Sequence, residues 1–97
     1  MITDFNEMCI ICNRPATDHH HIFKGHKQRH LADEDELILP LCREHHEGNM
    51  SVHKKMELNV LCEIIGQLAY EKKKVAEGML EAEARIDFME RYGRSYL

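Results

Sequence analysis

The sequence lacks any apolar run that approaches the length needed to cross a bilayer. Its first seven residues also lack the basic stretch and apolar run of a secretory leader. We therefore expect no membrane partner and a reducing cytoplasmic setting, where paired cysteines are more often metal ligands than disulfides. No internal repeat or low-complexity linker divides the 97 residues, so we predict a single domain over residues 1–97.

The chain also lacks an excess of basic residues. It has 13 Lys and Arg residues against 17 Asp and Glu residues, which gives a net charge of −4 with His neutral. A chain with this negative net charge is not expected to attract a polyanion such as DNA. A nucleic-acid enzyme, however, needs a basic surface only where it contacts its substrate. One basic run can be interpreted either as such a contact surface or as a solvated polar loop: Lys24, His26, Lys27, Arg29 and His30.

Proline is absent from residues 51–97, and the pattern of this half of the chain predicts helices. Ser51 is the expected N-cap of a helix that begins at Val52. The first half differs, because turn formers separate two short apolar segments. Residues 18–23 and 37–42 predict short strands that pair as a distorted hairpin. A long polar loop that begins at Gly25 is expected to join them.

Apolar residues recur every three or four positions through the second half, which predicts amphipathic helices. They are Leu58, Leu61, Ile65, Leu68, Val75, Met79, Ala82, Ile86 and Met89. The spacing suits one long helix with a coiled-coil seam, but Gly78 and the lysines at 72–74 favour two helices with a break between them. We interpret this stripe first as hydrophobic core and second as a surface for homodimerisation through the C-terminal helices.

Two short motifs with metal-ligand spacing predict a structural zinc site. Cys9 and Cys12 form a Cys-x2-Cys pair, and Cys42 and His45 form a Cys-x2-His pair. Zinc binds four such ligands tetrahedrally, and each short spacing lets two ligands reach one ion from a tight turn. The long separation between the pairs would let the ion tie distant parts of the chain together, so that binding energy becomes folding energy. His46 is a competing neighbour of His45.

A zinc ribbon does not need the remaining histidines near these motifs: His19, His20, His21, His46 and His53. Neighbouring residues on a strand point to opposite sides, so one strand histidine can ligate a metal while the next faces water. A hairpin packed on the following helix would bring one strand histidine, His46 and His53 to a single ion. Three protein ligands leave room for phosphate and water, and a strand histidine suits general-base work. The alternative is that these histidines are idle surface residues.

Together, these motifs resemble the zinc-stapled branch of the HNH, or ββα-metal, endonucleases, and are similar to those of small phage and prophage nucleases. The resemblance rests on four segments: Cys9 to Cys12, residues 18–22, residues 41–46 and His53. It covers roughly residues 8–60. It implies an α+β fold with a small zinc-stabilised hairpin-plus-helix core over residues 1–58 and an additional helical extension over residues 59–97.

The resemblance also implies roles for individual side chains. Asp18 stands two residues before a His-His pair, as is common in the family, which implies that His20 is a metal ligand and His21 the general base. His46 and His53 would complete the catalytic metal site.

Some assignments stay open. His19 with His20 is the alternative ligand–base pair. The family's central asparagine, expected at residues 36–37, has no counterpart, so a backbone carbonyl or another side chain must orient the base histidine. Lys24 and Arg29 are candidates for phosphate binding.

The implied function is metal-dependent hydrolysis of DNA phosphodiester bonds in the cytoplasm of a bacterium or a phage-infected cell. A structural Zn²⁺ and a catalytic divalent ion are the expected cofactors; Mg²⁺, Mn²⁺, Ni²⁺ and Zn²⁺ all fit, and three imidazoles favour the transition metals. DNA is the expected partner, with a protein partner as an additional hypothesis. The alternative functions are a non-catalytic zinc module that binds DNA or a protein as a regulator, and a scaffold that dimerises through its helices.

Overall fold

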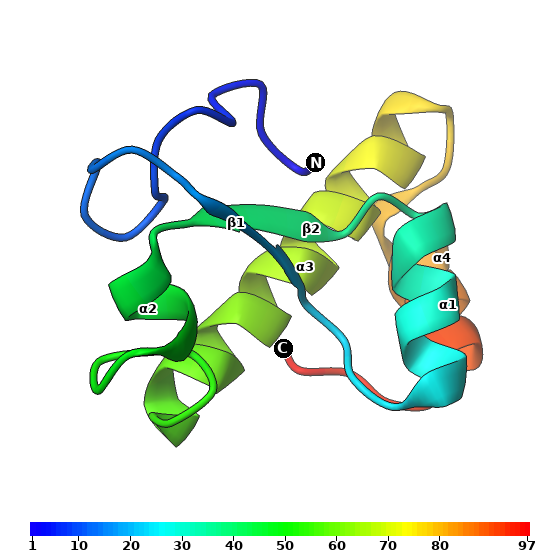
Figure 1. The fold of residues 1–97 in the computed structure, drawn as a ribbon. Coiled ribbons are helices and arrows are strands. Elements are labelled where there is room, and N and C mark those ends of the chain that lie inside the picture. The colour runs from blue at the N-terminus through cyan, green and yellow to red at the C-terminus, as the bar shows by residue number, and fades with distance from the viewer.

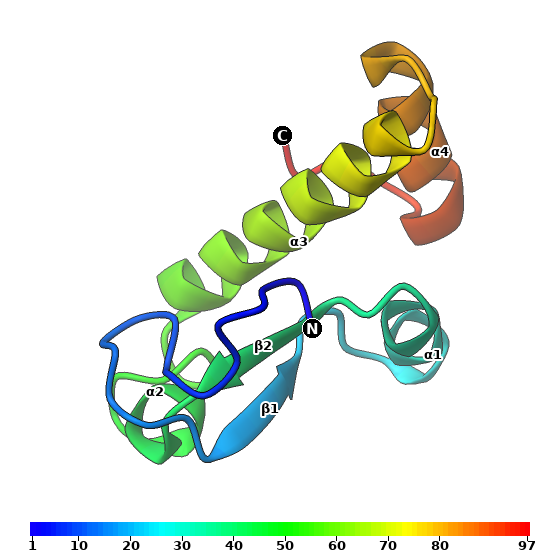
Figure 2. The ribbon, with the colours of Figure 1, turned by 90° about the horizontal axis from the view of Figure 1, so that it is seen from above.

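A computed structural model describes residues 1–97 and contains one two-stranded antiparallel sheet and four helices. The elements in chain order are β1 (Asp18–His21), α1 (His26–Glu34), β2 (Ile38–Leu41), α2 (Arg43–Glu47), α3 (Met56–Ala76) and α4 (Glu81–Tyr92). The hairpin of β1 and β2 lies at the centre, with α2 beyond one end and α1 beyond the other (Figure 1). The view from above shows α3 running along one face of the hairpin, with α4 folded back beside α3 (Figure 2).

The hairpin follows the predicted alternation of side chains. In the register of the sheet, Asp18 pairs with Leu41 and His20 pairs with Leu39. Along β1, Asp18 and His20 are buried, whereas His19 is exposed, because successive side chains of a strand point to opposite faces. The two predicted strands and the α+β class are therefore confirmed.

The connection between the strands is not the long polar loop that we expected. It contains α1, which begins directly after Gly25, a residue with a φ of 88°. No side chain caps the start of α1, so the sequence carries no strong start signal there. The weak signal that exists is spacing: Gln28, Leu31 and Ala32 follow a helical rhythm and are the residues of α1 that turn away from solvent.

The helical half begins later than predicted. Ser51 caps a turn and not a helix, because its hydroxyl accepts a hydrogen bond from the Lys54 amide at 3.2 Å. The helix α3 begins at Met56, after Lys55. His53 therefore lies in the turn before α3 and not in the first turn of a helix. The predicted break is confirmed, since α3 ends at Ala76 and α4 begins at Glu81, with Gly78 at a φ of 113° between them.

The interpretation of the apolar stripe as core is wrong for most of its members. These stripe residues are exposed large apolar side chains: Leu61, Leu68, Val75, Ile86 and Met89. The buried faces of α3 and α4 instead carry Cys62, Gly66, Gln67 and Tyr70 on α3 and Ala84, Phe88 and Tyr92 on α4.

Aromatic residues and one glycine build the centre of the core. The ring of Phe23 lies 4.7 Å from that of Tyr92, and Phe88 stacks on Tyr92 at 4.7 Å. Gly66 allows α3 to approach this cluster, because a Cβ atom at Gly66 would lie 3.1 Å from the side chains of both Ile22 and Phe23. A larger residue there would push the helix away from the end of β1.

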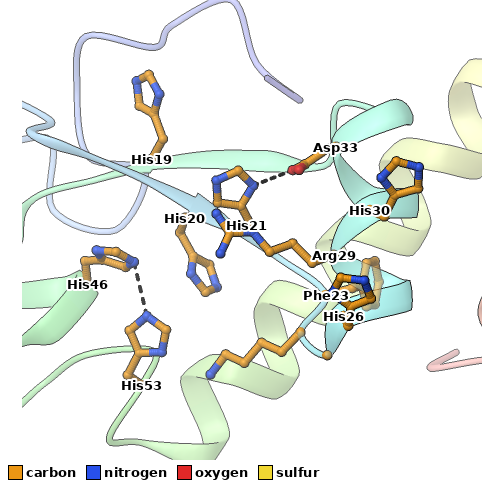
Figure 3. Close-up of a pocket in the computed structure, with 12 residues that line it drawn as sticks. His19, His20, His21, Phe23, His26, Arg29, His30, Asp33, His46 and His53 are labelled. Atoms are coloured by element: carbon orange, nitrogen blue, oxygen red, sulfur yellow. Dashed lines mark hydrogen bonds and ion pairs between the residues drawn. The ribbon is translucent and has the colours of Figure 1, made fainter.

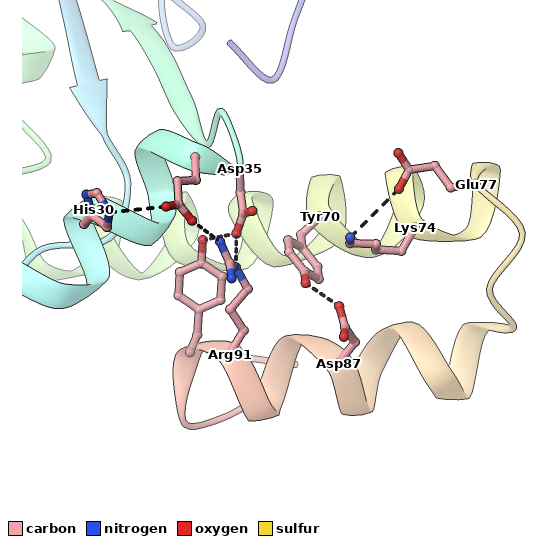
Figure 4. A network of polar contacts seen from close by, with 9 residues as sticks. His30, Asp35, Tyr70, Lys74, Glu77, Asp87 and Arg91 are labelled. Carbon is pink, nitrogen blue, oxygen red and sulfur yellow. Dashed lines mark hydrogen bonds and ion pairs between the residues drawn. The ribbon is translucent and has the colours of Figure 1, made fainter.

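Ion pairs attach α4 to the end of α1. Arg91 donates to Asp35 at 2.6 Å and to Glu34 at 2.8 Å, and the Tyr92 hydroxyl donates to Asp35 at 2.6 Å. Beside these contacts, Tyr70 on α3 donates to Asp87 on α4 (Figure 4). None of the four helices combines the length and apolarity that a membrane span needs.

Candidate metal centres

The four residues of the two short motifs meet in one cluster. One ligand atom each from Cys9, Cys12, Cys42 and His45 lies within 4.8 Å of the others. The Cys12 and Cys42 sulfurs are 3.8 Å apart, which matches the roughly 3.8 Å between two thiolates that bind one zinc ion tetrahedrally. His45 Nδ1 lies 3.8 Å from the Cys9 sulfur and 3.3 Å from the Cys42 sulfur, on either side of the roughly 3.6 Å of a zinc-bound pair. This cluster can hold a structural metal such as zinc, as predicted.

Backbone hydrogen bonds preform the first half of this cluster. The Cys9 amide donates to the Arg14 carbonyl at 2.7 Å, and the Asn13 amide donates to the Cys9 carbonyl at 2.9 Å. Asn13 turns the chain with a φ of 63°, a conformation that asparagine tolerates better than most residues. The resulting turn brings the side chains of Cys9 and Cys12 together.

The second half of the cluster comes from the start of α2. Cys42 is the residue before α2, and His45 lies in the helix. Arg14 donates to the Cys12 sulfur at 3.3 Å, and this bond lowers the pKa of the Cys12 thiol to about 6. The thiolate is the metal-binding form of cysteine. Because Cys9 and Cys12 come from the N-terminal turn and Cys42 and His45 follow β2, a metal bound to all four would tie this turn to the end of the hairpin.

Three further histidines converge beside this cluster. His20 comes from β1, His46 from α2 and His53 from the turn before α3, and one ring nitrogen of each lies within 4.8 Å of the others. We call these three residues the imidazole triad. The Nε2 atoms of His46 and His53 are 3.1 Å apart, within the roughly 3.0–3.4 Å between two imidazole nitrogens on one zinc ion. Figure 3 shows the three rings pointing toward one another.

The hydrogen bonds of the imidazole triad fit a metal site. His20 is 1% exposed, and its Nε2 atom is buried with no hydrogen-bond partner. A buried unpaired nitrogen is costly unless something binds it. Burial also lowers the pKa of His20 to about 3, so the ring is neutral near pH 7 and can offer a lone pair.

Asp18 fixes the orientation of His46. The Nδ1 atom of His46 donates to the Asp18 carboxylate at 2.7 Å, and this bond holds the pKa of Asp18 below its usual range. With the proton on Nδ1, the Nε2 atom of His46 carries the lone pair on the side of His53. A carboxylate behind a histidine is the arrangement found in many metal sites. The residues present therefore suit a divalent ion with nitrogen ligands.

His21 lies beside the imidazole triad but outside it. Its Nδ1 atom donates to the Asp33 carboxylate of α1 at 2.6 Å. The side chain of His21 is 29% exposed, so water can reach the ring. Asp33 therefore fixes the orientation of the His21 ring, whereas the sequence has no asparagine at residues 36–37.

The neighbouring His19 differs from His21. It is exposed and lies on the opposite side of β1 from His20. In Figure 3 its ring points away from the imidazole triad.

A polar cavity of about 730 Å³ opens over these residues, and only one of its twelve lining residues is hydrophobic. Its walls include His20, His21, His46 and His53, together with the two predicted phosphate-binding residues, Lys24 and Arg29. The helix α1 also supplies His26, His30 and Asp33 to this cavity. Sequence reasoning named His26 and His30 only as part of a basic run and missed Asp33, because it placed a loop where α1 lies.

Comparisons with family models, with curated proteins and with solved structures find no match to this chain.

Proposed function

We propose that this chain is an HNH-type endonuclease, a metal-dependent hydrolase of DNA phosphodiester bonds, with a cytoplasmic location in bacteria or phage-infected cells. The observation that carries the proposal is the imidazole triad: three converging nitrogen ligands, one of them buried without a partner, at the floor of a polar cavity. Three protein ligands leave positions for a phosphate oxygen, as a catalytic site requires.

In this proposal His20, His46 and His53 hold the catalytic ion. A divalent ion bound there supplies Lewis acidity, which polarises a phosphoryl oxygen and stabilises charge on the leaving oxygen. Imidazole ligands favour Mn²⁺, Ni²⁺ or Zn²⁺ over Mg²⁺. The adjacent zinc cluster supports the site, because His46 directly follows the zinc-binding residue His45.

His21 acts as the general base. Since Nδ1 of His21 donates its hydrogen bond to Asp33, the Nε2 atom carries the lone pair that takes a proton from water. The oxygen of that water then attacks phosphorus, the bond to the leaving sugar oxygen breaks, and the leaving oxygen takes a proton from solvent. Lys24 and Arg29 lie in the same cavity wall and provide the cationic groups that bind the phosphate backbone.

Plasmid cleavage tests this function. We expect the zinc-loaded protein to nick or linearise supercoiled plasmid when Mn²⁺ or Ni²⁺ is added, and to leave it intact when a chelator removes the added ion. Gel electrophoresis of the plasmid measures the result. The absence of cleavage with every divalent ion tried, by protein whose zinc content is intact, would contradict the proposal.

Asp33 provides a finer test of the same site. Replacing it with alanine frees the His21 ring, and we expect the cleavage rate to fall by roughly ten- to a hundredfold while metal content stays unchanged. Asp33→Asn keeps an oxygen that can accept the hydrogen bond from Nδ1 of His21, so this matched variant should retain most of the activity. Equal losses in Asp33→Ala and Asp33→Asn would show that the acceptor oxygen of residue 33 does not orient the base.

One observation favours a second function. The net charge of −4 is unfavourable for an enzyme that works on a polyanion. A non-catalytic zinc module that binds DNA or a protein as a regulator is therefore the alternative. Binding of a DNA duplex without cleavage, under the conditions that load both metal centres, would support it.

A further inference from the structure

We propose that α3 and α4 form a homodimer interface through the groove on their outer side. This groove, of about 760 Å³, lies between the two helices and is lined by eight residues. Its apolar residues are Leu68 and Val75 from α3 and Ala82 and Ile86 from α4. The groove is separate from the cavity of the imidazole triad, and none of its residues lines that cavity.

The apolar surface of the groove continues along both helices. Leu61, Leu68 and Val75 lie seven residues apart on α3 and therefore share one side of that helix. On α4, Ala82, Ile86 and Met89 are spaced by four and three residues, so they also share one side of their helix. They form one surface because α4 folds back beside α3 (Figure 2), and Arg85 of α4 pairs with Glu71 of α3.

This surface is unusually apolar for one that faces water. Leu68 is 52% exposed and Ile86 is 57% exposed. The inward sides of both helices are already occupied by the aromatic core, so more than half of each of these two side chains is left facing solvent. Contiguous exposed apolar side chains with a polar rim are characteristic of protein contact surfaces.

The charges around the groove indicate which partner fits. They are two acidic and two basic: Glu71, Lys72, Glu81 and Arg85. The chain as a whole carries a net charge of −4, so the net charges of two copies repel each other. At this groove the formal charges cancel, which makes it a suitable place for two copies to approach.

The distribution of these charges also suits a two-fold axis. Arg85 is paired with Glu71 across the groove at 2.8 Å, whereas Lys72 on α3 and Glu81 on α4 form no ion pair. In a two-fold dimer, any contact from residue i to residue j is repeated from j to i. A second copy placed across the groove can therefore pair its Glu81 with Lys72, and its Lys72 with Glu81.

Analytical ultracentrifugation of the 97-residue, zinc-loaded chain tests this dimer. We expect a species of twice the 11.4 kDa chain mass at micromolar concentrations. Ile86→Glu places a charge in the groove and should leave the protein monomeric. Val60→Glu is the matched control, since Val60 is an exposed apolar residue of α3 outside the groove. Circular dichroism and zinc content verify that both variants are folded.

Charge reversal distinguishes this dimer from other modes of association. Lys72→Glu and Glu81→Lys should each raise the dissociation constant by on the order of tenfold, because each turns two symmetry-related attractions into repulsions. The double variant restores both pairs, and its dissociation constant should return to near the original value. A wild-type protein that stays monomeric over this range, or a double variant weaker than either single variant, would overturn the proposal.

Discussion

Replacing Cys9 or Cys42 with serine is expected to unfold the protein. A zinc ion held by Cys9, Cys12, Cys42 and His45 would join the N-terminal turn to the start of α2, and zinc binding by such sites contributes about 10–16 kcal/mol. A small domain has a free energy of unfolding of only about 5–15 kcal/mol. Loss of the ion therefore removes an amount comparable to the entire stability. Circular dichroism and zinc content measure the result, and a strong chelator should have the same effect on the wild-type chain.

Cys62 offers a matched control for this prediction. It is buried in α3 but lies outside the zinc cluster. Cys62→Ala should keep the zinc and lose only about 1–2 kcal/mol of stability, the usual cost of a small core truncation. If Cys9→Ser melts at the wild-type temperature with no bound zinc, the cluster is not what stabilises this fold.

Replacing His21 with alanine is expected to abolish most of the DNA cleavage. A positioned general base contributes about 10²–10⁴-fold to the rate, so we expect a loss of that size in His21→Ala. Because His21 is not a member of the imidazole triad, the metal content of the variant should stay unchanged. The cleavage rate on supercoiled plasmid, with ion content measured on the same sample, provides the readout.

His19→Ala is the matched control for His21→Ala, and it also tests the alternative ligand–base pair of His19 with His20. His19 lies on the opposite side of β1 from His20 and is exposed, so its loss should change the rate little. His46→Ala should differ from both, because it removes a ligand and with it the second ion. A fully active His21→Ala together with an inactive His19→Ala would reverse the assignment.

The residue spacing was sufficient to predict which ligands converge. Cys9, Cys12, Cys42 and His45 follow short motifs whose geometry depends on local turns. The alternation along β1 predicted only that neighbouring histidines face opposite sides; the choice of His20 came from the resemblance, and the structure buries His20. The geometry within each pair and the alternation along a strand depend on residues close together in sequence, and for that reason a single sequence can indicate them.

The parts that failed depend on contacts between distant residues. The pairing of Asp33 with His21 requires α1 to lie against the end of β1, and only weak local signals indicate that α1 exists. For a related reason, the sequence pattern led us to expect the exposed apolar side of α3 and α4 to be the buried side. Their heptad-spaced aliphatic residues suggested a core, whereas the core that forms uses Gly66 and a set of aromatic residues contributed by three segments of the chain: Phe23, Tyr70, Phe88, Tyr92 and Tyr96.

The central claim is that His20, His46 and His53 bind one divalent ion. Anomalous diffraction from crystals soaked in Mn²⁺ or Ni²⁺ tests it most directly. We predict an anomalous peak within about 2.0–2.3 Å of one nitrogen of each of these three rings, separate from the zinc peak among the cysteines. A zinc peak in the cysteine cluster with none between the three imidazoles, at saturating ion, would contradict the claim and leave a zinc-stabilised fold without a catalytic centre.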